Sequence, residues 1–377
     1  MDYELLKLIW WLLIGVLLIG FAIADGFDFG VLSLLRWVGR TDNERRVVLN
    51  TVGPHWDGNQ VWFITAGGAI FAAWPVVYAV AFSGLYWALL LVLFALFFRP
   101  VGFEYRSKIE SARWRNNWDW VLTTASLVPS LVFGVAFGNL LLGVPFHFDE
   151  QLLPFYEGTF WQLLTPFALL CGLVSVTLLM SHGGIYLQLR TEGAMQARAR
   201  TAVMWLSLLC AVLFVLAGIW VAFLPGLSIT AIPPHHLAST PLDKTVAIGN
   251  GGWLANYRLF PLLQAVPVVA VVMLLATWLL ARVNRPGVGF VTSSLAIAAV
   301  IFTAAGSLFP FVLPSSSNIN HSLTLWDVTS SEKTLTIMFG VAVIFVPIVL
   351  SYTAWGYWKM RGRVTQQHIE ENPYSTY

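Results

Sequence analysis

The stretch LKLIWWLLIGVLLIGFAIADGFDFGVLSLLRW, residues 6–37, decides the fold class of this chain. Residues 8–24 within it contain no charged side chain. An α-helix rises ~1.5 Å per residue, so this run covers roughly 26 Å of the ~30 Å hydrocarbon layer of a bilayer. Because that layer offers no water to unpaired backbone groups, the stretch is predicted to cross the membrane as a helix.

The composition excludes a soluble enzyme and a nucleic-acid-binding protein. Of the 377 residues, 58% are hydrophobic and 11% are charged, whereas soluble proteins contain roughly 25% charged residues. The formal net charge is +2, and no run of Lys and Arg alternates with aromatic residues as a nucleic-acid interface requires. Cys171 and Cys210 lie in apolar runs, so we expect buried thiols rather than a disulfide or a cysteine metal site.

Eight more apolar runs follow the first, and together they predict an all-α, polytopic membrane protein with nine spanning helices. The predicted spans are 6–37, 52–74, 77–99, 118–143, 160–188, 201–225, 258–282, 288–313 and 335–359. Short cytoplasmic segments are enriched in Lys and Arg. If the N-terminus is outside and the C-terminus cytoplasmic, 17 of the 21 basic residues fall inside the cell. They are Arg36, Arg40, Arg45, Arg46, Arg99, Arg106, Lys108, Arg113, Arg115, Arg190, Arg198, Arg200, Arg282, Arg285, Lys359, Arg361 and Arg363.

Two sequence echoes indicate an internal duplication within this single membrane domain, residues 1–377. The residues 99–103 after the third span resemble 285–290 after the seventh, and 11–13 resemble 161–164. The interpretation is one four-helix bundle within 1–143, a second within 160–313, one extra peripheral helix at 335–360 and a cytoplasmic tail at 361–377. The alternative is that Arg-Pro pairs recur because they are common helix stops at a membrane surface.

Two carboxylates interrupt the first span near its predicted cytoplasmic end. Asp25 and Asp28 are three residues apart and therefore share one helix face. Ionisable groups cost roughly 2.5–3.5 kcal/mol at the centre of a spanning helix, and they usually face a bundle interior or a water path. One interpretation is an internal ion pair with Arg99 that fastens the first span to the third. Neighbouring acids repel unless one is protonated or paired, and either outcome suits a proton relay, which we favour.

Two further acids are predicted at the same depth. Asp57 begins the second span and Asp119 the fourth, and an acid in the first turn of a helix offsets the macrodipole for about 0.3–1 kcal/mol. We favour that explanation for Asp119. Asp57 has His55, Asn59 and Gln60 within one turn, which is more hydrogen-bonding capacity than a helix start requires. The functional and structural interpretations of Asp57 therefore both stay open.

Histidine is scarce in the predicted spans. Only His182 is well placed within one, whereas a haem-binding bundle needs His, Met or Cys ligands that face a central cavity. His182 is therefore predicted to be a hydrogen-bonded core or interface residue, and no closed metal site is expected. Motifs for dinucleotides, phosphate loops and serine nucleophiles are also missing from the sequence.

Several strings resemble subunit II of the bacterial cytochrome bd ubiquinol oxidase family. The likeness covers essentially the whole chain, and Pro54-His55-Trp56-Asp57-Gly58-Asn59-Gln60-Val61-Trp62 is its most specific part. The other strings are Ile9-Trp10-Trp11-Leu12-Leu13-Ile14-Gly15, Asp25-Gly26-Phe27-Asp28-Phe29-Gly30, Phe98-Arg99-Pro100, Phe309-Pro310-Phe311-Val312-Leu313-Pro314-Ser315-Ser316 and Ser322-Leu323-Thr324-Leu325-Trp326-Asp327.

The resemblance implies a subunit of a heterodimer in the bacterial inner membrane that oxidises quinol and reduces dioxygen to water. In that family the companion subunit I ligates two b-type haems and haem d and carries the quinol-oxidising loop. This agrees with the shortage of haem ligands found in the present sequence. Small single-span accessory subunits often join such complexes, and a tightly held quinone can occupy the subunit II bundle. No catalytic residue is therefore expected in this chain.

The resemblance also implies roles for particular residues. Family proton-uptake carboxylates match Asp57 and, less closely, Asp25 and Asp28, and the Trp that matches Trp62 borders a hydrophobic oxygen route. The expected mechanism is vectorial: oxygen reduction takes its protons from the cytoplasm, quinol releases its own outside, and charge separates without a pump. The residues expected to support this path by polar contacts or ion pairs are Arg99, Asp119, Asn59 and Gln60.

Two other interpretations stay open at the level of the sequence. A proton-coupled transporter would use the same acids, and a chemically silent scaffold would only hold subunit I. Purification with a haem-bearing partner favours the oxidase, whereas a colourless monomer that moves a solute favours the transporter. Acid-to-amide substitutions without any effect favour the scaffold.

Overall fold

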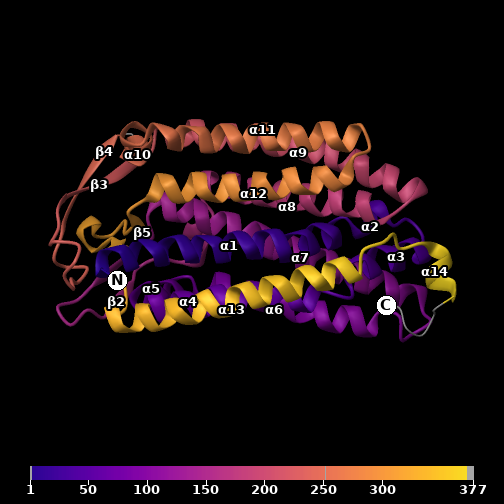
Figure 1. The fold of residues 1–377 in the computed structure, drawn as a ribbon, viewed down its shortest axis with the longest axis horizontal. Helices are drawn as coiled ribbons and strands as arrows, with labels where there is room; N and C mark the ends of the chain where they lie inside the picture. The colour runs from indigo at the N-terminus through magenta and orange to yellow at the C-terminus, as the bar shows by residue number, and fades with distance from the viewer. Residues whose placement is uncertain (1, 251, 372–377) are drawn as a thin grey trace.

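The computed structural model describes residues 2–250 and 252–371, which form an elongated bundle of helices (Figure 1). The last part of the predicted cytoplasmic tail, 372–377, lies outside the described residues. Within the described residues, nine helices of 18 residues or more make up the bundle. They are α1 (Tyr3–Ser33), α4 (Trp56–Ala73), α6 (Tyr86–Tyr105), α7 (Ala112–Leu142), α8 (Pro166–Arg190), α9 (Gly193–Val221), α11 (Ala265–Arg282), α12 (Pro286–Leu308) and α13 (Glu332–Lys359).

The connections gather at the two ends of the bundle (Figure 1). One end, called the α3 end here, carries α2 (Leu35–Val38), α3 (Asp42–Val52) and α14 (Gln366–Glu371). The opposite end, called the strand end, carries the start of α1 and three antiparallel strand pairs. These are β1 (Phe146–Phe148) with β2 (Pro154–Tyr156), β3 (Pro225–Ala231) with β4 (Thr245–Asn250), and β5 (Phe311–Leu313) with β6 (Leu323–Thr324). The remaining short elements are α5 (Pro75–Gly84), α10 (Ala255–Leu259) and 3-10 turns at Phe160–Leu163, Gly252–Leu254, Pro261–Gln264 and Ile319–His321.

The prediction of a helical membrane protein is confirmed in that the structure is mostly helical, with three short strand pairs. Among the described residues, eight helices are long and apolar enough to cross a membrane: α1, α6, α7, α8, α9, α11 with its preceding turn, α12 and α13. The predicted span 52–74 contains α4, which has 18 residues. The side chains of Asp57, Asn59 and Gln60 make the first turns of α4 polar and lower its mean hydropathy.

The predicted third span, 77–99, has the wrong boundaries. The helix is interrupted at Leu85, so that α5 ends at Gly84 and α6 runs on to Tyr105. A Cβ atom on Gly84 would lie 2.6 Å from the ring of Tyr156, so this glycine allows α5 to lie directly on β2. No charged residue marks the break, because residues 75–98 are almost uniformly apolar. Hydropathy alone therefore could not locate it.

Helix α1 lies inside the bundle and packs against α4, α7, α8, α12 and α13. Its crossing with α8 is very close: a Cβ atom on Gly30 would lie 2.0 Å from the carbonyl oxygen of Leu179, and one on Gly183 would lie 2.3 Å from the amide nitrogen of Val31. Small residues allow two helix backbones to approach in this way. The two glycines therefore determine where the acids of α1 lie.

The other long helices surround this crossing. Helices α8, α9, α11 and α12 pack on one another, and α6 packs on α7. Helix α13 lies along the outside of the bundle in Figure 1 and contacts α1. Only 6% of the most apolar 18-residue stretch of α13 is buried, so most of this helix is available to lipid or to another protein.

Buried lysines hold the loops at the strand end. The ammonium group of Lys7, on α1, donates to the backbone carbonyls of Leu237 at 3.1 Å and Trp326 at 2.7 Å, one in each of two long loops. Lys244 forms a buried ion pair with Asp327 at 3.0 Å. Burial lowers the pKa of Lys244 and raises that of Asp327, while their attraction opposes both shifts.

At the α3 end, Glu44 closes the first turn of α3. Its carboxylate accepts hydrogen bonds from the backbone N–H of Thr41, in a capping box, and from Arg198 of α9 at 2.5 Å. Partial burial acts to raise the pKa of Glu44, but these hydrogen bonds together hold it below its ordinary value of 4.5. Glu44 thus links the α3 end to the bundle by a contact that requires its negative charge.

We expect Gly183→Ala to lower the thermal midpoint of the purified protein, because the new methyl group would push the backbones of α1 and α8 apart. Differential scanning fluorimetry measures this shift. The matched control is Gly218→Ala in α9, where nothing lies within 4 Å of the added Cβ atom. That variant should be neutral or slightly stabilising, since glycine costs a helix about 0.5–1 kcal/mol relative to alanine. Equal midpoints for the two variants would contradict the close crossing.

The Glu44 contact predicts a pH dependence of stability. A carboxylate whose pKa is depressed by folding stabilises the protein above its unfolded pKa, and this contribution is lost as the pH falls through the folded pKa. The thermal midpoint should therefore fall more steeply below about pH 4.5 in the wild type than in Glu44→Gln. Glu192→Gln, at an exposed acid before α9, serves as the control and should keep the wild-type slope.

Candidate functional site: buried acids near the α3 end

The two acids of α1 are fully buried, and one of them forms an ion pair. Asp25 and Asp28 are both 0% exposed. Arg99 of α6 binds Asp25 through two parallel hydrogen bonds, of 3.0 Å from Nη1 and 2.7 Å from Nη2. The guanidinium group also lies over the rings of Phe29 at 4.6 Å and Trp56 at 5.5 Å. The structure therefore contains the ion pair that the sequence offered as one interpretation, and this pair joins α1 to α6.

Asp28 differs from Asp25 because no guanidinium group binds it directly. Its Oδ2 atom accepts a 2.7 Å hydrogen bond from the side-chain amide of Asn59 on α4. Its Oδ1 atom is buried without a hydrogen-bond partner. The nearest ring nitrogen is Nδ1 of His55, 3.8 Å from Oδ1. The structure thus brings Asp28, Asn59 and His55 together across the contact between α1 and α4.

Asp57 lies on a different face of α4 from Asn59. Side chains two positions apart in an α-helix point about 200° away from each other around its axis. Accordingly, Asp57 is exposed while Asn59 is 3% exposed. Val61 is on the exposed side with Asp57, at 54% exposed, and Gln60 is half-buried between the two faces. The predicted proton-path acids are therefore divided between the interior and the surface of the bundle.

Trp62 lies against α1. A Cβ atom on Gly20 would be 2.7 Å from the indole ring of Trp62, so this glycine provides the space for it. Trp62 belongs to a cluster of apolar side chains that includes Phe21 and Phe133. This cluster extends from α4 through α1 to α7, so Trp62 borders a continuous apolar region.

The macrodipole explanation for Asp119 was wrong. Helix α7 begins at Ala112 rather than at the predicted 118, so Asp119 lies about two turns inside the helix. Its carboxylate binds Arg106 at 2.5 Å and Arg45 at 2.9 Å. Arg106 also binds Asp42 of α3 at 2.8 Å. Asp119 therefore anchors the α3 segment to the bundle. The helix start was predicted too late because the polar and charged residues before 118 are typical of a loop.

The two buried histidines of the described residues, His55 and His182, are both engaged in hydrogen bonds. His182 is 0% exposed, and both ring nitrogens are engaged, Nδ1 with the Ser293 hydroxyl at 2.7 Å and Nε2 with the Ile23 carbonyl at 3.1 Å. The prediction of a hydrogen-bonded core histidine is confirmed. The Nε2 atom of His55 is likewise engaged by Tyr186. Among the described residues, no group of three or more His, Cys, Asp or Glu side chains has metal-binding geometry.

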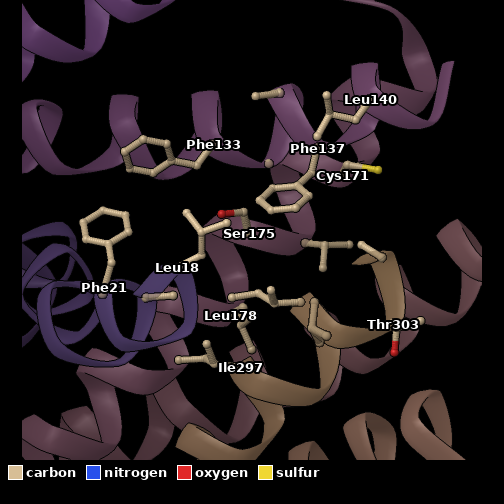
Figure 2. A pocket seen from close by; sticks show the side chains of 18 of the residues that line it. Leu18, Phe21, Phe133, Phe137, Leu140, Cys171, Ser175, Leu178, Ile297 and Thr303 are labelled. Atoms are coloured by element: carbon tan, nitrogen blue, oxygen red, sulfur yellow. The ribbon is translucent and has the colours of Figure 1, made fainter. Parts of the chain in front are cut away.

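A large apolar cavity is lined by residues of α1, α4, α5, α6, α7, α8, α9, α11 and α12, and Figure 2 shows part of its wall. Its volume is about 1470 Å³. Its wall is mostly aliphatic and aromatic, and the polar side chains in it are few, such as Ser175 and Thr303. The other lining residues labelled in Figure 2 are Leu18, Phe21, Phe133, Phe137, Leu140, Cys171, Leu178 and Ile297. A cavity of this kind suits a long hydrophobic molecule with a small polar head.

Sequence reasoning missed two tyrosines of the site. Tyr357 of α13 donates a hydrogen bond to the side-chain oxygen of Asn59. Tyr186 of α8 lies 2.9 Å from Nε2 of His55, measured from its hydroxyl oxygen. Both tyrosines sit in apolar runs far from the acids in the sequence, and only the packing of α8 and α13 brings them to α4. Nothing in the local sequence marked them.

These features define a class: a polytopic helical membrane protein with buried acids near one end and a large apolar cavity between its helices. Within this class, the chain belongs to the cytochrome bd terminal oxidase subunit II family, whose sequence profile matches residues 6–360. The resemblance drawn from the sequence is therefore confirmed.

Relatives and a solved structure agree with this family. The chain is 56% identical over 377 residues to cytochrome bd-I ubiquinol oxidase subunit 2 of Escherichia coli strain K12, with 100% of both chains covered. It is 32% identical over 359 residues to cytochrome bd ubiquinol oxidase subunit 2 of Bacillus subtilis, covering 95% of this chain and 97% of that one. The structure of bd oxidase from Geobacillus thermodenitrificans has the same fold, with a TM-score of 0.67 and 15% identity over 94% of this chain and 98% of that chain.

We expect Arg99→Met to destabilise the protein by about 3–5 kcal/mol, because Asp25 would be left as an unpaired buried charge. The double variant Asp25→Leu with Arg99→Met removes both charges and should recover most of the loss. Thermal midpoints of the purified complex measure both effects. Arg36→Met is the control, since Arg36 binds Asn116 at a partly exposed position. If the double variant is as unstable as Arg99→Met, the loss of stability does not come from an unpaired charge on Asp25.

Proposed function

We propose that this chain takes protons from the cytoplasm and delivers them to a haem-bearing partner, subunit I, in a terminal oxidase that oxidises quinol and reduces dioxygen to water. The observation that carries this proposal is the group of acids at one depth: Asp25 and Asp28 inside the bundle and Asp57 on its surface. Carboxylates inside a membrane protein typically mark proton or ion pathways.

The proposed membrane orientation follows from charge. Arg36, Arg45, Arg106 and Arg115 all lie at the α3 end, and Lys and Arg are enriched on the cytoplasmic side. We therefore place the α3 end in the cytoplasm and the strand end outside, in the bacterial inner membrane. With α4 counted as a span, the chain crosses nine times, as two four-helix bundles and the peripheral helix α13.

The proposed contact with subunit I uses the surface that carries Asp57. An ionisable group facing lipid is costly, so a protein partner is the better neighbour for the exposed carboxylate. The adjoining helices offer a large apolar surface, with Phe97 of α6 at 53% and Ile348 of α13 at 57% exposed. An apolar patch of this kind around a polar centre is typical of a protein interface in a membrane complex.

In the proposed mechanism this chain moves protons and no electrons. The haems b and d, ligated by subunit I, supply the oxygen chemistry. Asp57 receives protons from the cytoplasm and passes them to the partner, while Asp25, Asp28 and Arg99 set the local potential. Quinol releases its protons outside, so charge separates across the membrane without a pump. The apolar region beside Trp62 offers oxygen a route toward the partner.

Further ligands belong to the same proposal. The large cavity has the size and the apolar wall that a structural quinone requires. Ser175 and Thr303 are among the few polar side chains of its wall. The exposed apolar helices of the chain also leave room for small single-span accessory subunits.

We expect Asp57→Asn to slow oxygen consumption by roughly tenfold or more, because a placed proton-transfer group typically contributes 10²–10⁴-fold. The haem absorption spectrum should not change. The measurement is quinol-dependent oxygen uptake by the purified complex, together with proton uptake in vesicles. The matched control is Glu157→Gln, at an exposed acid of the strand end. Unchanged turnover and proton uptake in the Asp57→Asn complex would reject the role and leave this chain as a scaffold.

A further inference from the structure

A network of hydrogen bonds surrounds Asp28, and its donors can be assigned. The hydroxyl of Tyr357 donates to the side-chain oxygen of Asn59. The amide nitrogen of Asn59 then carries two hydrogens, one of which goes to Oδ2 of Asp28 at 2.7 Å. The other faces Nδ1 of His55 at 3.3 Å. Because an amide nitrogen cannot accept, Nδ1 of His55 must be the acceptor in this contact.

The opposite side of the His55 ring supports the same assignment. The hydroxyl of Tyr186 donates to the backbone carbonyl of Thr51 at 3.1 Å. Its single hydrogen is thereby used, so in its 2.9 Å contact with Nε2 of His55 the hydroxyl oxygen is the acceptor. His55 is therefore neutral, with its hydrogen on Nε2 and a lone pair on Nδ1 that accepts the hydrogen bond from Asn59. Tyr186 fixes this tautomer.

The assignment leaves room for one proton. Oδ1 of Asp28 is buried without a hydrogen-bond partner, and it lies 3.8 Å from Nδ1 of His55. Two acceptors thus face each other with no hydrogen between them. A buried polar atom without a partner is costly, and a proton bound at Nδ1 would give Oδ1 a donor after a small rotation of the ring, in place of the 3.3 Å contact between Nδ1 and Asn59. The other oxygen of Asp28 and the other nitrogen of His55 are already occupied.

We infer that His55 and Asp28 form a one-proton storage site on the route from the cytoplasm to the partner, with Tyr186 as its positioning residue. This inference rests on the proposed function. The step is a proton transfer alone: a proton from water binds Nδ1 of His55, an imidazolium–carboxylate pair forms with Asp28, and the proton later leaves toward the partner. No electron moves, and no bond other than N–H or O–H forms or breaks.

The surroundings of His55 make it better suited to this role than the neighbouring acids. Asp25 is held by both Nη atoms of Arg99, and Asp57 is on the outer face of α4. His55 is 8% exposed and Tyr357, near the end of α13, is half-buried, so the cluster reaches the surface at the α3 end. The titratable or charged side chains around His55 are Asp25, Asp28, Asp57, Arg99, Tyr186, Arg190 and Tyr357.

The test is the pH profile of oxygen consumption by the purified complex, with His55→Gln as the main variant. Glutamine keeps polar atoms at the site but does not bind a proton near neutral pH. Without the imidazole, Asp28 alone remains at the site, and the proton is no longer shared between two groups. The midpoint of the alkaline limb of the profile should therefore shift to lower pH by roughly one unit or more. The haem spectrum and the KM for quinol should not change.

Tyr186→Phe tests the same site by a smaller change. Without the hydroxyl of Tyr186, His55 is no longer held with its hydrogen on Nε2. Its hydrogen then lies on Nδ1 part of the time and occupies the position between Nδ1 and Oδ1 of Asp28. The alkaline limb should move in the same direction by a smaller amount. The matched control is His236→Gln, at an exposed histidine of the strand end, and it should keep the wild-type profile.

The outcomes separate this inference from the proposed function. A shifted alkaline limb in His55→Gln or, if that variant does not assemble, in Tyr186→Phe supports the storage site. Wild-type profiles in every variant that assembles overturn it, even when Asp57→Asn is slow, and the proposed function then stands without it. A complex with no quinol-dependent oxygen uptake overturns the proposed function itself.

Discussion

The close crossing of α1 and α8 at Gly30 and Gly183 is the constraint on which the site depends. Backbone atoms of the two helices meet there without side chains between them, so neither helix can shift or rotate without a clash. Because the crossing is only two residues from Asp28 along α1, it brings this carboxylate within reach of side chains from both α4 and α8. The glycines thus position charged groups that they do not contact.

The buried ion pairs of α1 and α7 and the large apolar cavity occupy different parts of the bundle. The buried acids of α1 and α7 and their arginine partners lie toward the α3 end, where the ion pairs of Asp25 with Arg99 and of Asp119 with Arg45 each join segments distant in the sequence. The large cavity lies beside them and has an almost wholly apolar wall. Charges inside a membrane protein are costly unless they are paired or hydrated, and the acids of α1 and α7 are accordingly paired or hydrogen-bonded.

Much of the site could be predicted from the sequence because its acids stand out against apolar runs. Asp25, Asp28 and Asp57 were identified in this way, and the string around Asp57 identified the family. The break at Leu85 was missed because apolar residues continue through it. The roles of Tyr186 and Tyr357 were missed because aromatic residues are ordinary in a spanning helix, and their hydroxyl groups gain a role only from neighbours on other helices.

The sequence by itself determined that this is a polytopic helical membrane protein, because long uncharged runs have no other stable arrangement in a bilayer. It also determined which residues carry charge in those runs and which family the chain belongs to. Only the tertiary structure decided how the acids divide, with Asp25 paired to Arg99, Asp28 left with a free oxygen beside His55, and Asp57 on the outer face. The physical reason is that pairing and burial depend on distances between helices, and residues far apart in the sequence set those distances.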